Sequence, residues 1–267
     1  MHAKVRLLLE RIARGRVFRK RLPASFGGRP IYVSPDSALS YLKASWSASE
    51  DLFSAATRYV RPGACVWDIG GNVGVFALAA AHRAGSSGRV ISVEADPFLA
   101  SLLQRTVLHA RNQDLSISVL CAAASSASGL ARFNVAARGR SSNALEQAGA
   151  RVTAGGVRYV QVVPAITLDQ LLAEFARPDL GKIDVEGAEA MVLEGAGRLL
   201  SEHRPALYVE VGEEQRAQVG EILKRHRYKL FDGDVADARE LDACAWNTLA
   251  VPQESSMTNA GFGGTTA

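Results

Sequence analysis

The sequence has few cysteines and no long apolar run. Its 267 residues include three cysteines, Cys65, Cys121 and Cys244, which lie far apart and form no CxxC spacing. This pattern predicts neither a disulfide framework nor a zinc site, and we expect reduced thiols in a cytoplasmic protein. The longest wholly apolar run, 75–81, is far shorter than the roughly 20 residues that cross a bilayer. No secretion signal is visible, so we expect no secretion.

An excess of charge of one sign is also absent from most of the chain. The formal net charge is +4, and the hydrophobic share of 48% is ordinary for a globular protein. Residues 1–29, however, contain nine Lys and Arg and one acid, whereas 22 bases and 26 acids are spread over the other 238 residues. The chain is therefore a mildly acidic body with a basic arm, which argues against nucleic-acid binding over the whole surface.

The basic arm carries a short apolar stripe. Val5, Leu8, Leu9 and Ile12 fall at helical spacing, which predicts a helix whose other faces are basic. This helix could dock on the body, or an anionic membrane leaflet could attract it through residues 1–21. We expect residues 1–59 to form this arm and a helical cap. Within them we expect loops and short strands over 23–37 and a helix over Glu50–Tyr59. At the other end, 253–267 is expected to be a disordered tail.

Residues 60–252 alternate between strand-like and helical patterns. We expect strands over 65–69, 89–95, 117–123, 182–185, 206–211, 228–231 and 247–251, and helices over 73–82, 97–111, 168–175, 189–200 and 213–227. Such alternation predicts an α/β fold with a mostly parallel sheet that helices cover on both faces. The insert 129–163 interrupts the pattern with two further strand-like pieces. A ligand is expected beyond the carboxyl ends of the strands, where strand order reverses.

The first strand ends in the segment DIGGNVG, residues 68–74. Its glycines let the backbone turn tightly and let a ligand approach without a Cβ in the way. The carboxylate of Asp68 would repel the pyrophosphate of a dinucleotide, and the spacing GxGxxG is absent. A ligand that carries an ammonium and a sulfonium group would instead be attracted. These features favour a cationic nucleoside ligand over a nicotinamide cofactor.

An acid also closes the second strand. Glu94 lies 24 residues past Gly70, near the spacing at which an acid accepts hydrogen bonds from two ribose hydroxyls. Together with the first loop, this acid specifies a nucleoside with a positively charged appendage, which is S-adenosylmethionine. Small residues, among them Cys121 and Ala122, close the third strand and would leave a slot for an adenine ring.

Three more acids end the fourth and fifth strands. Asp184 and Glu186 would point to the same side of an extended chain, and Glu210 would join them if the two strands are neighbours. One of these acids could act as a general base, two could hold a divalent cation such as Mg²⁺, or they could bind backbone amides at a helix start. Glu189 is expected to be only a first-turn acid that the helix dipole favours. None of the five histidines closes a strand at this edge.

Several of these segments together resemble one family. DIGGNVG, VEADP (93–97), KIDVEGAEAMVLEGAGRLL (182–200), PALYVEV (205–211) and NTLAVP (247–252) are similar to segments of the FkbM family of S-adenosylmethionine-dependent methyltransferases. The resemblance covers roughly 60–252, and Gly71 departs from it where the family usually has Ala. It implies a Rossmann-like class I methyltransferase fold, and O-methylation of a small molecule or saccharide. Residues 1–59 and the insert match little, and we expect them to encode substrate choice.

Two other functions stay open at this point. The basic arm would suit an RNA methyltransferase, although no nucleic-acid module is visible elsewhere and we expect no nucleic-acid partner. A non-catalytic protein that binds S-adenosylmethionine is the other, although the intact acids argue against it. The candidate catalytic residues are Asp184, Glu186 and Glu210. The candidate cofactor-binding residues are Glu50, Asp68, Gly70, Gly71, Asn72, Gly74, Glu94, Ala95, Cys121, Ala122 and Asp184.

Overall fold

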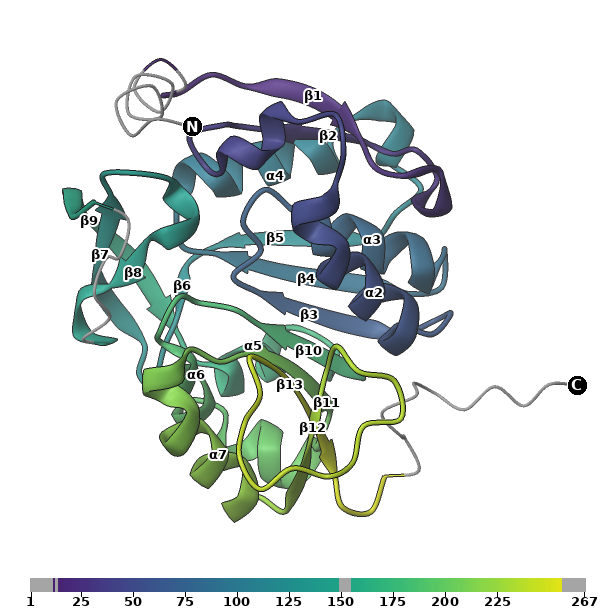
Figure 1. The fold of residues 1–267 in the computed structure, drawn as a ribbon, viewed down its shortest axis with the longest axis vertical. Coiled ribbons are helices and arrows are strands. Elements are labelled where there is room, and N and C mark those ends of the chain that lie inside the picture. The colour runs from purple at the N-terminus through teal and green to yellow at the C-terminus, as the bar shows by residue number, and fades with distance from the viewer. Residues whose placement is uncertain (1–11, 13, 149–154, 256–267) are drawn as a thin grey trace, which may run out of the picture.

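Seven strands form the main sheet of the protein, which is described here from a computed structural model covering residues 12, 14–148 and 155–255 (Figure 1). In chain order they are β3 (Cys65–Ile69), β4 (Arg89–Glu94), β5 (Ile117–Cys121), β10 (Leu180–Ile183), β11 (Ala206–Glu210), β12 (Tyr228–Asp232) and β13 (Asn247–Pro252). Their spatial order is β12-β13-β11-β10-β3-β4-β5. The neighbours from β11 to β5 are parallel, and β13 is antiparallel to both β11 and β12. The expected mostly parallel, seven-stranded α/β fold is therefore confirmed.

Strand order reverses between β3 and β10. The chain steps outward from β3 to β5 and then returns to the other side of β3 with β10. In such sheets the crevice outside the carboxyl ends at the reversal is where ligands bind. The carboxyl ends of β3, β4 and β10 are therefore the place to look for a site.

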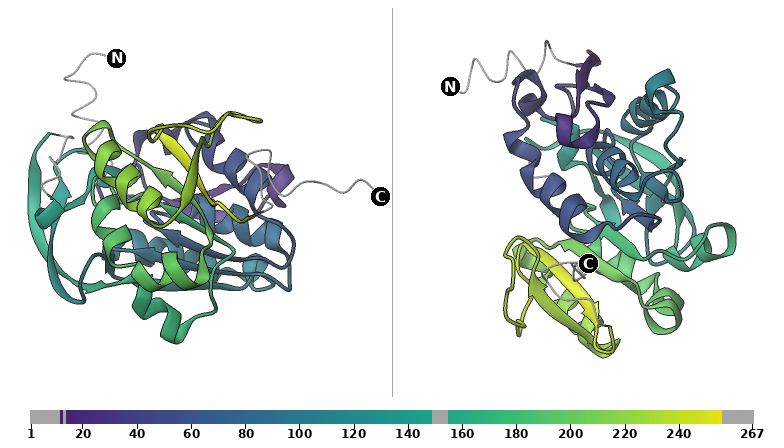
Figure 2. Two further views of the ribbon diagram at one scale, coloured as in Figure 1. Left: turned by 90° about the horizontal axis from the view of Figure 1, so that it is seen from below. Right: turned by 90° about the vertical axis from the view of Figure 1, so that its right-hand side faces the viewer.

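Helices cover both faces of this sheet (Figure 2). They are α2 (Glu50–Tyr59), α3 (Val75–Ala84), α4 (Pro97–Val107), α5 (Leu168–Glu174), α6 (Glu189–Glu194) and α7 (Arg216–Arg225), with a π-helical turn at Leu199–His203. Shorter 3₁₀ turns lie at Ala24–Phe26, Leu39–Leu42, Ser47–Ser49, Ala110–Asn112, Arg140–Ser142, Glu146–Ala148 and Glu213–Gln215. Along β3, Val66 packs in the core with α2 to α4, and Trp67 packs in the core with α5 to α7. Successive side chains of the strand point to opposite faces of the sheet, so β3 contributes residues to the core on each face.

The N-terminal segment is part of the first of these cores. Strand β1 (Phe18–Arg21) pairs antiparallel with β2 (Pro30–Val33), and Ile31 and Val33 are fully buried in the cluster that holds α3. The expected boundary between residues 59 and 60 lies inside this shared core. Residues 18–21 were expected to belong to the arm, and no strand was foreseen there, because these four residues, three of them basic, show no strand pattern. The predicted helix over Val5–Ile12 and the predicted tail lie largely outside the described residues.

The insert folds into a second sheet. Strands β6 (Ala123–Ala124), β7 (Gly129–Ala136), β8 (Ala144–Leu145) and β9 (Val157–Ile166) lie in the order β6-β9-β7-β8. In Figure 1 the arrowheads of β3, β4 and β5 point toward this sheet. The insert therefore stands at the carboxyl edge of the main sheet, where a ligand is expected. Among the described residues, no helix is long and apolar enough to span a membrane.

Candidate active site

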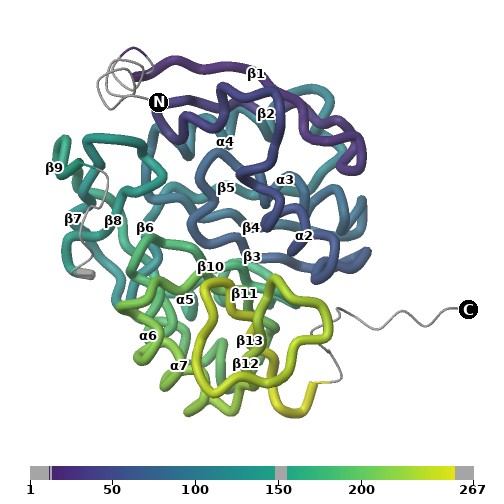
Figure 3. The backbone as a smooth tube through the Cα atoms, viewed as in Figure 1, coloured from purple at the N-terminus to yellow at the C-terminus, as the bar shows by residue number. Residues whose placement is uncertain are grey.

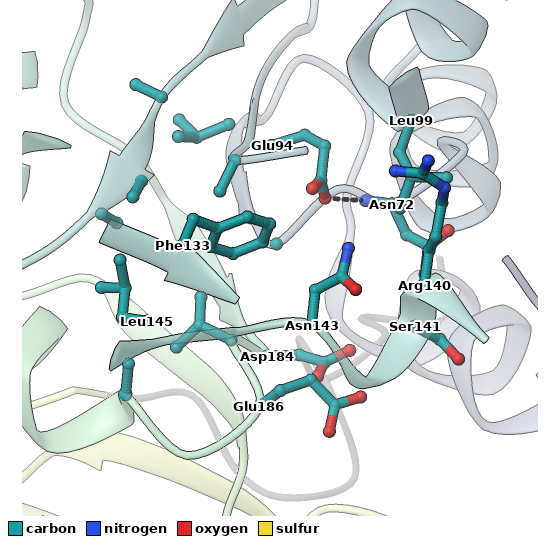
Figure 4. Close-up of a pocket in the computed structure, with 18 residues that line it drawn as sticks. Asn72, Glu94, Leu99, Phe133, Arg140, Ser141, Asn143, Leu145, Asp184 and Glu186 are labelled. Carbon is teal, nitrogen blue, oxygen red and sulfur yellow. Dashed lines mark hydrogen bonds between the residues drawn. The ribbon is translucent and has the colours of Figure 1, made fainter. Parts of the chain in front are cut away.

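A pocket of about 580 Å³, counting the open space at its mouth, lies between the main sheet and the insert sheet (Figure 4). Its walls come from the glycine loop after β3, the end of β4, the segment 184–188 after β10, and the insert. The volume is within the range of ligand sites in proteins. The pocket sits where strand order reverses, as the topology requires.

Gly70 and Asn72 bring the glycine loop into this wall. Gly70 has φ +82°, and a Cβ on it would lie 1.8 Å from the backbone oxygen of Asp184. Only glycine allows this turn and this approach. The Asn72 side-chain oxygen accepts hydrogen bonds from the Ser37 hydroxyl at 2.7 Å and from the Val73 amide at 2.8 Å. The loop is thus fixed against both the N-terminal segment and the end of β10.

The other two glycines of the loop do not face the pocket. A Cβ on Gly71 would lie 2.1 Å from the Ser92 hydroxyl, and a Cβ on Gly74 would lie 2.1 Å from Cδ1 of Leu103. Neither glycine lines the pocket. The expectation that they make room for a ligand is therefore corrected: Gly71 makes room for β4, and Gly74 makes room for α4.

Glu94 faces the pocket at the end of β4. Its two carboxylate oxygens accept backbone N–H bonds from Asn72 and Asp96, both at 2.7 Å, and its side chain is 7% exposed. Burial raises the pKa of Glu94 to about 7, although the two backbone donors lower it. Each oxygen keeps a further lone pair for a ligand hydroxyl. The position predicted from spacing is thus equipped to accept two hydroxyl donors.

Asp68 lies beneath the pocket. Its carboxylate is fully buried, accepts a hydrogen bond from the Ser92 hydroxyl at 3.1 Å and lies 3.7 Å from the Lys182 ammonium. Burial raises its pKa, which the positive charge of Lys182 opposes. Because Asp68 is not in the pocket wall, a direct contact with a ligand ammonium is not what this structure provides. The position of Asp68 at the end of its strand gave no sign that Lys182 already lies beside this carboxylate.

Asp184 and Glu186 both line the pocket, but not for the predicted reason. Strand β10 ends at Ile183, and Glu186 has φ +53°, a left-handed conformation. The alternation of an extended chain therefore does not apply to these two residues. They reach the same pocket because the chain turns toward it at Glu186.

Lys182 is a residue that sequence reasoning missed. Its ammonium donates to Asp184 at 3.0 Å and to the Gly70 backbone oxygen at 3.2 Å. Asp184 and Asp68 raise the pKa of this lysine despite its burial. A lysine inside an apolar strand was the available signal, since buried charges need partners. The ammonium ties the glycine loop to the segment that carries Asp184.

The pKa values of two acids at this edge are high. Burial raises the pKa of Glu186 to about 8, and the negative charges of Asp184, Glu210 and Glu189 add to the shift. The Glu186 side chain is exposed at the pocket's mouth, so solvent offsets part of the burial effect. Burial and the charge of Asp184 likewise raise the pKa of Glu210 to about 8. The acids after β10 and β11 therefore interact, as expected from neighbouring strands, although Glu210 is not in the pocket wall.

Glu189 does more than the sequence indicated. It is 2% exposed, and one carboxylate oxygen accepts the backbone N–H groups of Val185 at 3.2 Å and Gly187 at 3.0 Å. Burial raises its pKa. Glu189, which was expected only to be stabilised by the helix dipole, therefore also fixes the turn that carries Glu186. Of the roles weighed for the acids, binding of backbone amides at a helix start belongs to Glu189.

The remaining predicted residues divide between the pocket and the surface. Ala95 and Ala122 line the pocket, whereas Cys121 is exposed and outside it. Glu50 is exposed at the start of α2 and does not line the pocket either, so the structure does not bring it to the site. None of the four described histidines is in the wall.

The insert supplies a buried ion network to the same wall. Arg140 is 8% exposed and donates to Asp36 at 3.0 Å and to Asp96 at 2.5 Å. Asn143 donates to the same Asp96 oxygen at 2.7 Å, and the ring of Phe133 faces the pocket (Figure 4). Sequence reasoning missed these three insert residues, because nothing local places Arg140 beside acids that lie far away in the sequence.

The carboxylates do not form an obvious metal site. Among the described residues, no group of three or more His, Cys, Asp and Glu side chains is arranged to hold a metal ion. The ammonium of Lys182 already lies between the carboxylates of Asp68 and Asp184. Of the three acids considered for a divalent cation, Asp184 is thus already paired with this lysine.

The residues present fit S-adenosylmethionine. Glu94 offers two acceptors for ribose hydroxyls, the loop at Gly70 is open to close approach, and Ala122 and Phe133 offer apolar surface for a ring. The carboxylates of Asp184 and Glu186 add negative charge at the same pocket, which suits a cationic ligand.

The sequence and the fold were compared with those of known proteins. Residues 68–232, more than half of the chain, match the family described as the methyltransferase FkbM domain. No match was found among curated proteins. A solved precorrin-6y C5,15-methyltransferase from Geobacter metallireducens GS-15 matches at 11% identity over 76% of this chain and 86% of that chain, with a TM-score of 0.46.

Two further solved structures are also similar. The methyltransferase FkbM from Methylobacillus flagellatus KT matches at 16% identity over 76% of this chain and 58% of that chain, with a TM-score of 0.44. Fibrillarin from Aeropyrum pernix, solved with natively bound S-adenosylmethionine, matches at 15% identity over 90% of this chain and 86% of that chain, with a TM-score of 0.43. On the match over residues 68–232, the chain belongs to the FkbM family of S-adenosylmethionine-dependent methyltransferases.

Proposed function

We propose that this protein transfers a methyl group from S-adenosylmethionine to a hydroxyl group of a small molecule or saccharide. The observation that carries the proposal is the pair of carboxylates, Asp184 and Glu186, in the wall of the pocket that also contains Glu94. An alcohol is a poor acid, so its methylation needs a group that accepts the proton. A carboxylate whose pKa lies near the working pH is suited to that role.

The donor half of the pocket follows from the contacts already described. Glu94 would accept hydrogen bonds from the two ribose hydroxyls, and Ala122 and Phe133 would contact the adenine. The loop at Gly70 and Asn72 would approach the methionine part of the donor. When bound, S-adenosylmethionine supplies an electrophilic methyl group on a positively charged sulfur.

Glu186 is the residue proposed to accept the proton. The hydroxyl oxygen forms a bond to the methyl carbon as the carbon–sulfur bond breaks, and the hydroxyl proton passes to the Glu186 carboxylate. Asp184 and Glu210 hold the pKa of Glu186 up, which strengthens it as a base. Glu189 holds the turn that orients it. Lys182 holds Asp184 in place through a hydrogen bond of 3.0 Å.

The acceptor half of the pocket is assigned to the insert. Ser141 and Leu145 line the pocket from the insert sheet and its loops. These residues combine apolar surface with a hydroxyl, which suits an acceptor that carries hydroxyl groups on a carbon framework.

The three cysteines are all free thiols, which is consistent with a cytoplasmic location.

A labelled donor tests this assignment. The protein is incubated with S-adenosylmethionine that carries an isotopically labelled methyl group, together with a panel of sugars, other hydroxylated compounds and amines. Mass spectrometry then locates the label. The expected product is a methyl ether, which survives mild alkaline treatment that would cleave a methyl ester. Label found on nitrogen or carbon would overturn O-methylation while leaving the family assignment intact.

Substitution of the base gives the mechanistic test. Glu186→Gln keeps the shape and removes the basicity, so we expect transfer to slow by about 10²- to 10⁴-fold while donor affinity stays within about threefold. Glu214→Gln removes an exposed acid elsewhere and is the matched control. Normal turnover in both Glu186→Gln and Asp184→Asn would show that the cluster is structural. Loss of activity in EDTA, restored by Mg²⁺, would replace the carboxylate base with a metal-assisted route.

A further inference from the structure

The N-terminal hairpin has an outer face that the methyltransferase site does not use. In the β1–β2 pair Arg19 lies opposite Tyr32, and Ile31 and Val33 point the other way into the core. Arg21, two residues after Arg19, therefore lies on the same outer face as Arg19 and Tyr32. Figure 1 shows this hairpin along one end of the molecule, with α4 beside it.

The end of α4 extends this face. The Arg105 guanidinium lies 4.0 Å from the centre of the Tyr32 ring, and the Tyr32 backbone N–H donates to the Thr106 hydroxyl at 3.0 Å. Leu108 follows one turn after Arg105, and Arg111 lies in the next turn of the chain. We call these six residues the hairpin patch: Arg19, Arg21, Tyr32, Arg105, Leu108 and Arg111.

The charge of the hairpin patch is not neutralised. Within the described part of the chain, none of its four arginines forms an ion pair. The nearby acid Asp114 is already engaged by Arg29, through two hydrogen bonds of 2.5 and 2.6 Å. Four exposed arginines near one another can attract anionic groups from outside the protein.

An apolar side chain projects from the same region: Leu108 is 65% exposed. Phe18 is also 43% exposed, but it is paired with the inward-facing Val33 and lies on the other side of the hairpin. An exposed apolar group flanked by bases suits the boundary between lipid headgroups and acyl chains. Phosphates would attract the arginines, while Leu108 would enter the boundary.

Nucleic acid is the competing partner for a basic face. Single-stranded RNA is bound by stacking bases on free aromatic rings. Two of the aromatic rings near this face are already covered on one side by a cation: Arg105 lies over Tyr32, and Lys20 lies 4.0 Å from the centre of the Trp46 ring. A third ring, Phe18, is paired with the inward-facing Val33 and so lies off this face. The combination of covered rings and the exposed aliphatic Leu108 therefore favours lipid.

We infer that the hairpin patch docks the protein on an anionic membrane surface. The sequence alone left a membrane contact through residues 1–21 as one of two alternatives, the other being docking on the body. The folded chain adds Arg105, Leu108 and Arg111, which lie more than 80 residues further along. This proposal is independent of the acceptor and of the proton-accepting residue.

Vesicle binding tests the proposal with the full chain. The probes are phosphatidylcholine vesicles and vesicles in which about one lipid in three is phosphatidylglycerol. The patch variant is Arg19→Gln with Arg105→Gln. The matched control is Arg225→Gln with Arg239→Gln, two exposed arginines on the part of the chain at the opposite end of the molecule (Figure 3). Both variants lose two positive charges and retain every basic residue before Arg19.

We expect the unmodified chain to bind anionic vesicles and not neutral ones, with affinity that falls as salt is added. The patch variant should bind about 25-fold more weakly, about fivefold for each arginine, and the control should bind as the unmodified chain does. Leu108→Ser should weaken the residual binding at high salt, where the arginines are screened. Donor affinity should be unchanged in all variants, which shows that they fold.

Three results would overturn the proposal. Equal binding by the patch variant and the control would show that net charge, not this face, attracts the vesicles. Tighter binding to a short single-stranded RNA than to anionic vesicles, lost in the patch variant, would identify the partner as nucleic acid. If the unmodified chain did not bind anionic vesicles at all, a membrane would also be excluded as the partner of this face.

Discussion

Glu94 connects the glycine loop, the end of β4 and the pocket through a single carboxylate. Glu94→Gln should weaken S-adenosylmethionine binding by about 1.5–3 kcal/mol, because a charged acceptor for two hydroxyls becomes neutral. The raised pKa of Glu94 also predicts the direction of the pH dependence. Donor affinity of the unmodified chain should increase as pH rises through about 7, because hydroxyls donate best to the ionised carboxylate. Calorimetry at about pH 6 and about pH 8 measures both effects. Equal affinity for the donor in Glu94→Gln and in the exposed control Glu174→Gln would contradict the assignment.

Lys182 offers a second test at the scale of one residue. Lys182→Met leaves the carboxylates of Asp68 and Asp184 without their cation, so the field at the pocket becomes more negative. The ratio of affinities for S-adenosylmethionine over S-adenosylhomocysteine should then rise severalfold, because only the former carries a charge on sulfur. Titration calorimetry gives the ratio, and Lys229→Met is the control. A merely structural role would weaken both ligands alike and leave the ratio unchanged.

The sequence could predict the role of a residue where that role follows from neighbouring residues in the chain, and not where it depends on partners in distant segments. Glu94 and Ala122 were found because each closes a strand, and strand ends follow from local apolar runs. Lys182 and Arg140 were missed because their meaning comes from partners on other segments. Asp184 and Glu186 were placed correctly, although the argument assumed an extended strand that in fact ends at Ile183.

At the scale of elements, Gly74 sets the distance between α3 and α4. Gly74→Ala should lower the free energy of unfolding by about 1–3 kcal/mol, because the new Cβ would meet buried Leu103. Gly28→Ala also has a positive φ, +55°, but open space around its Cβ, so the difference between the two variants reports mainly the contact with α4. Denaturant unfolding measures both. Equal losses would mean that backbone strain, not packing, explains this glycine.

Arg140 fastens the insert to the body. Arg140→Met should cost about 3–5 kcal/mol of stability, because it leaves the buried carboxylate of Asp96 without a cation and leaves Asp36 with Arg158 alone. Arg132→Met, which breaks the exposed pair with Glu146 in the same insert, should cost about 1 kcal/mol or less. Thermal and denaturant unfolding separate the two. A small loss in Arg140→Met would show that solvent reaches the network.

The order and type of most elements could be predicted, because alternating apolar periods are local. The strands and helices of the main sheet were expected within a few residues of where they lie. The expected helix over 189–200 is shorter and ends at Glu194, before Gly195 and Gly197, and a π-helical turn follows. Strand β1 and the joining of β6 to β9 could not be foreseen, since they depend on pairing between distant segments.

At the scale of the whole molecule, the raised pKa values predict how stability depends on pH. Glu94, Glu186 and Glu210 have an ordinary pKa of 4.5, and in the folded chain these values rise to about 7, 8 and 8. Between pH 4.5 and about 8 these three acids therefore bind more protons in the folded chain than in the unfolded chain, so their contribution to stability falls as pH rises through this window. His82 and His226, whose pKa values burial lowers, act in the opposite direction. Glu186→Gln with Glu210→Gln should remove part of the fall in Tm, and Glu214→Gln should not. Equal dependence of Tm on pH in the unmodified chain and in all variants would contradict the raised pKa values of these acids.

The ion network of Arg140 also bears on how the chain folds. Its two acidic partners are 104 and 44 residues away along the sequence, so both contacts close long loops. Closing such loops is slow and entropically costly, and it follows the local formation of helices and hairpins. The wall of the pocket is therefore completed late in folding, after most secondary structure exists. Binding of the methyl donor consequently reports the finished fold, and during refolding it should lag behind the recovery of circular dichroism.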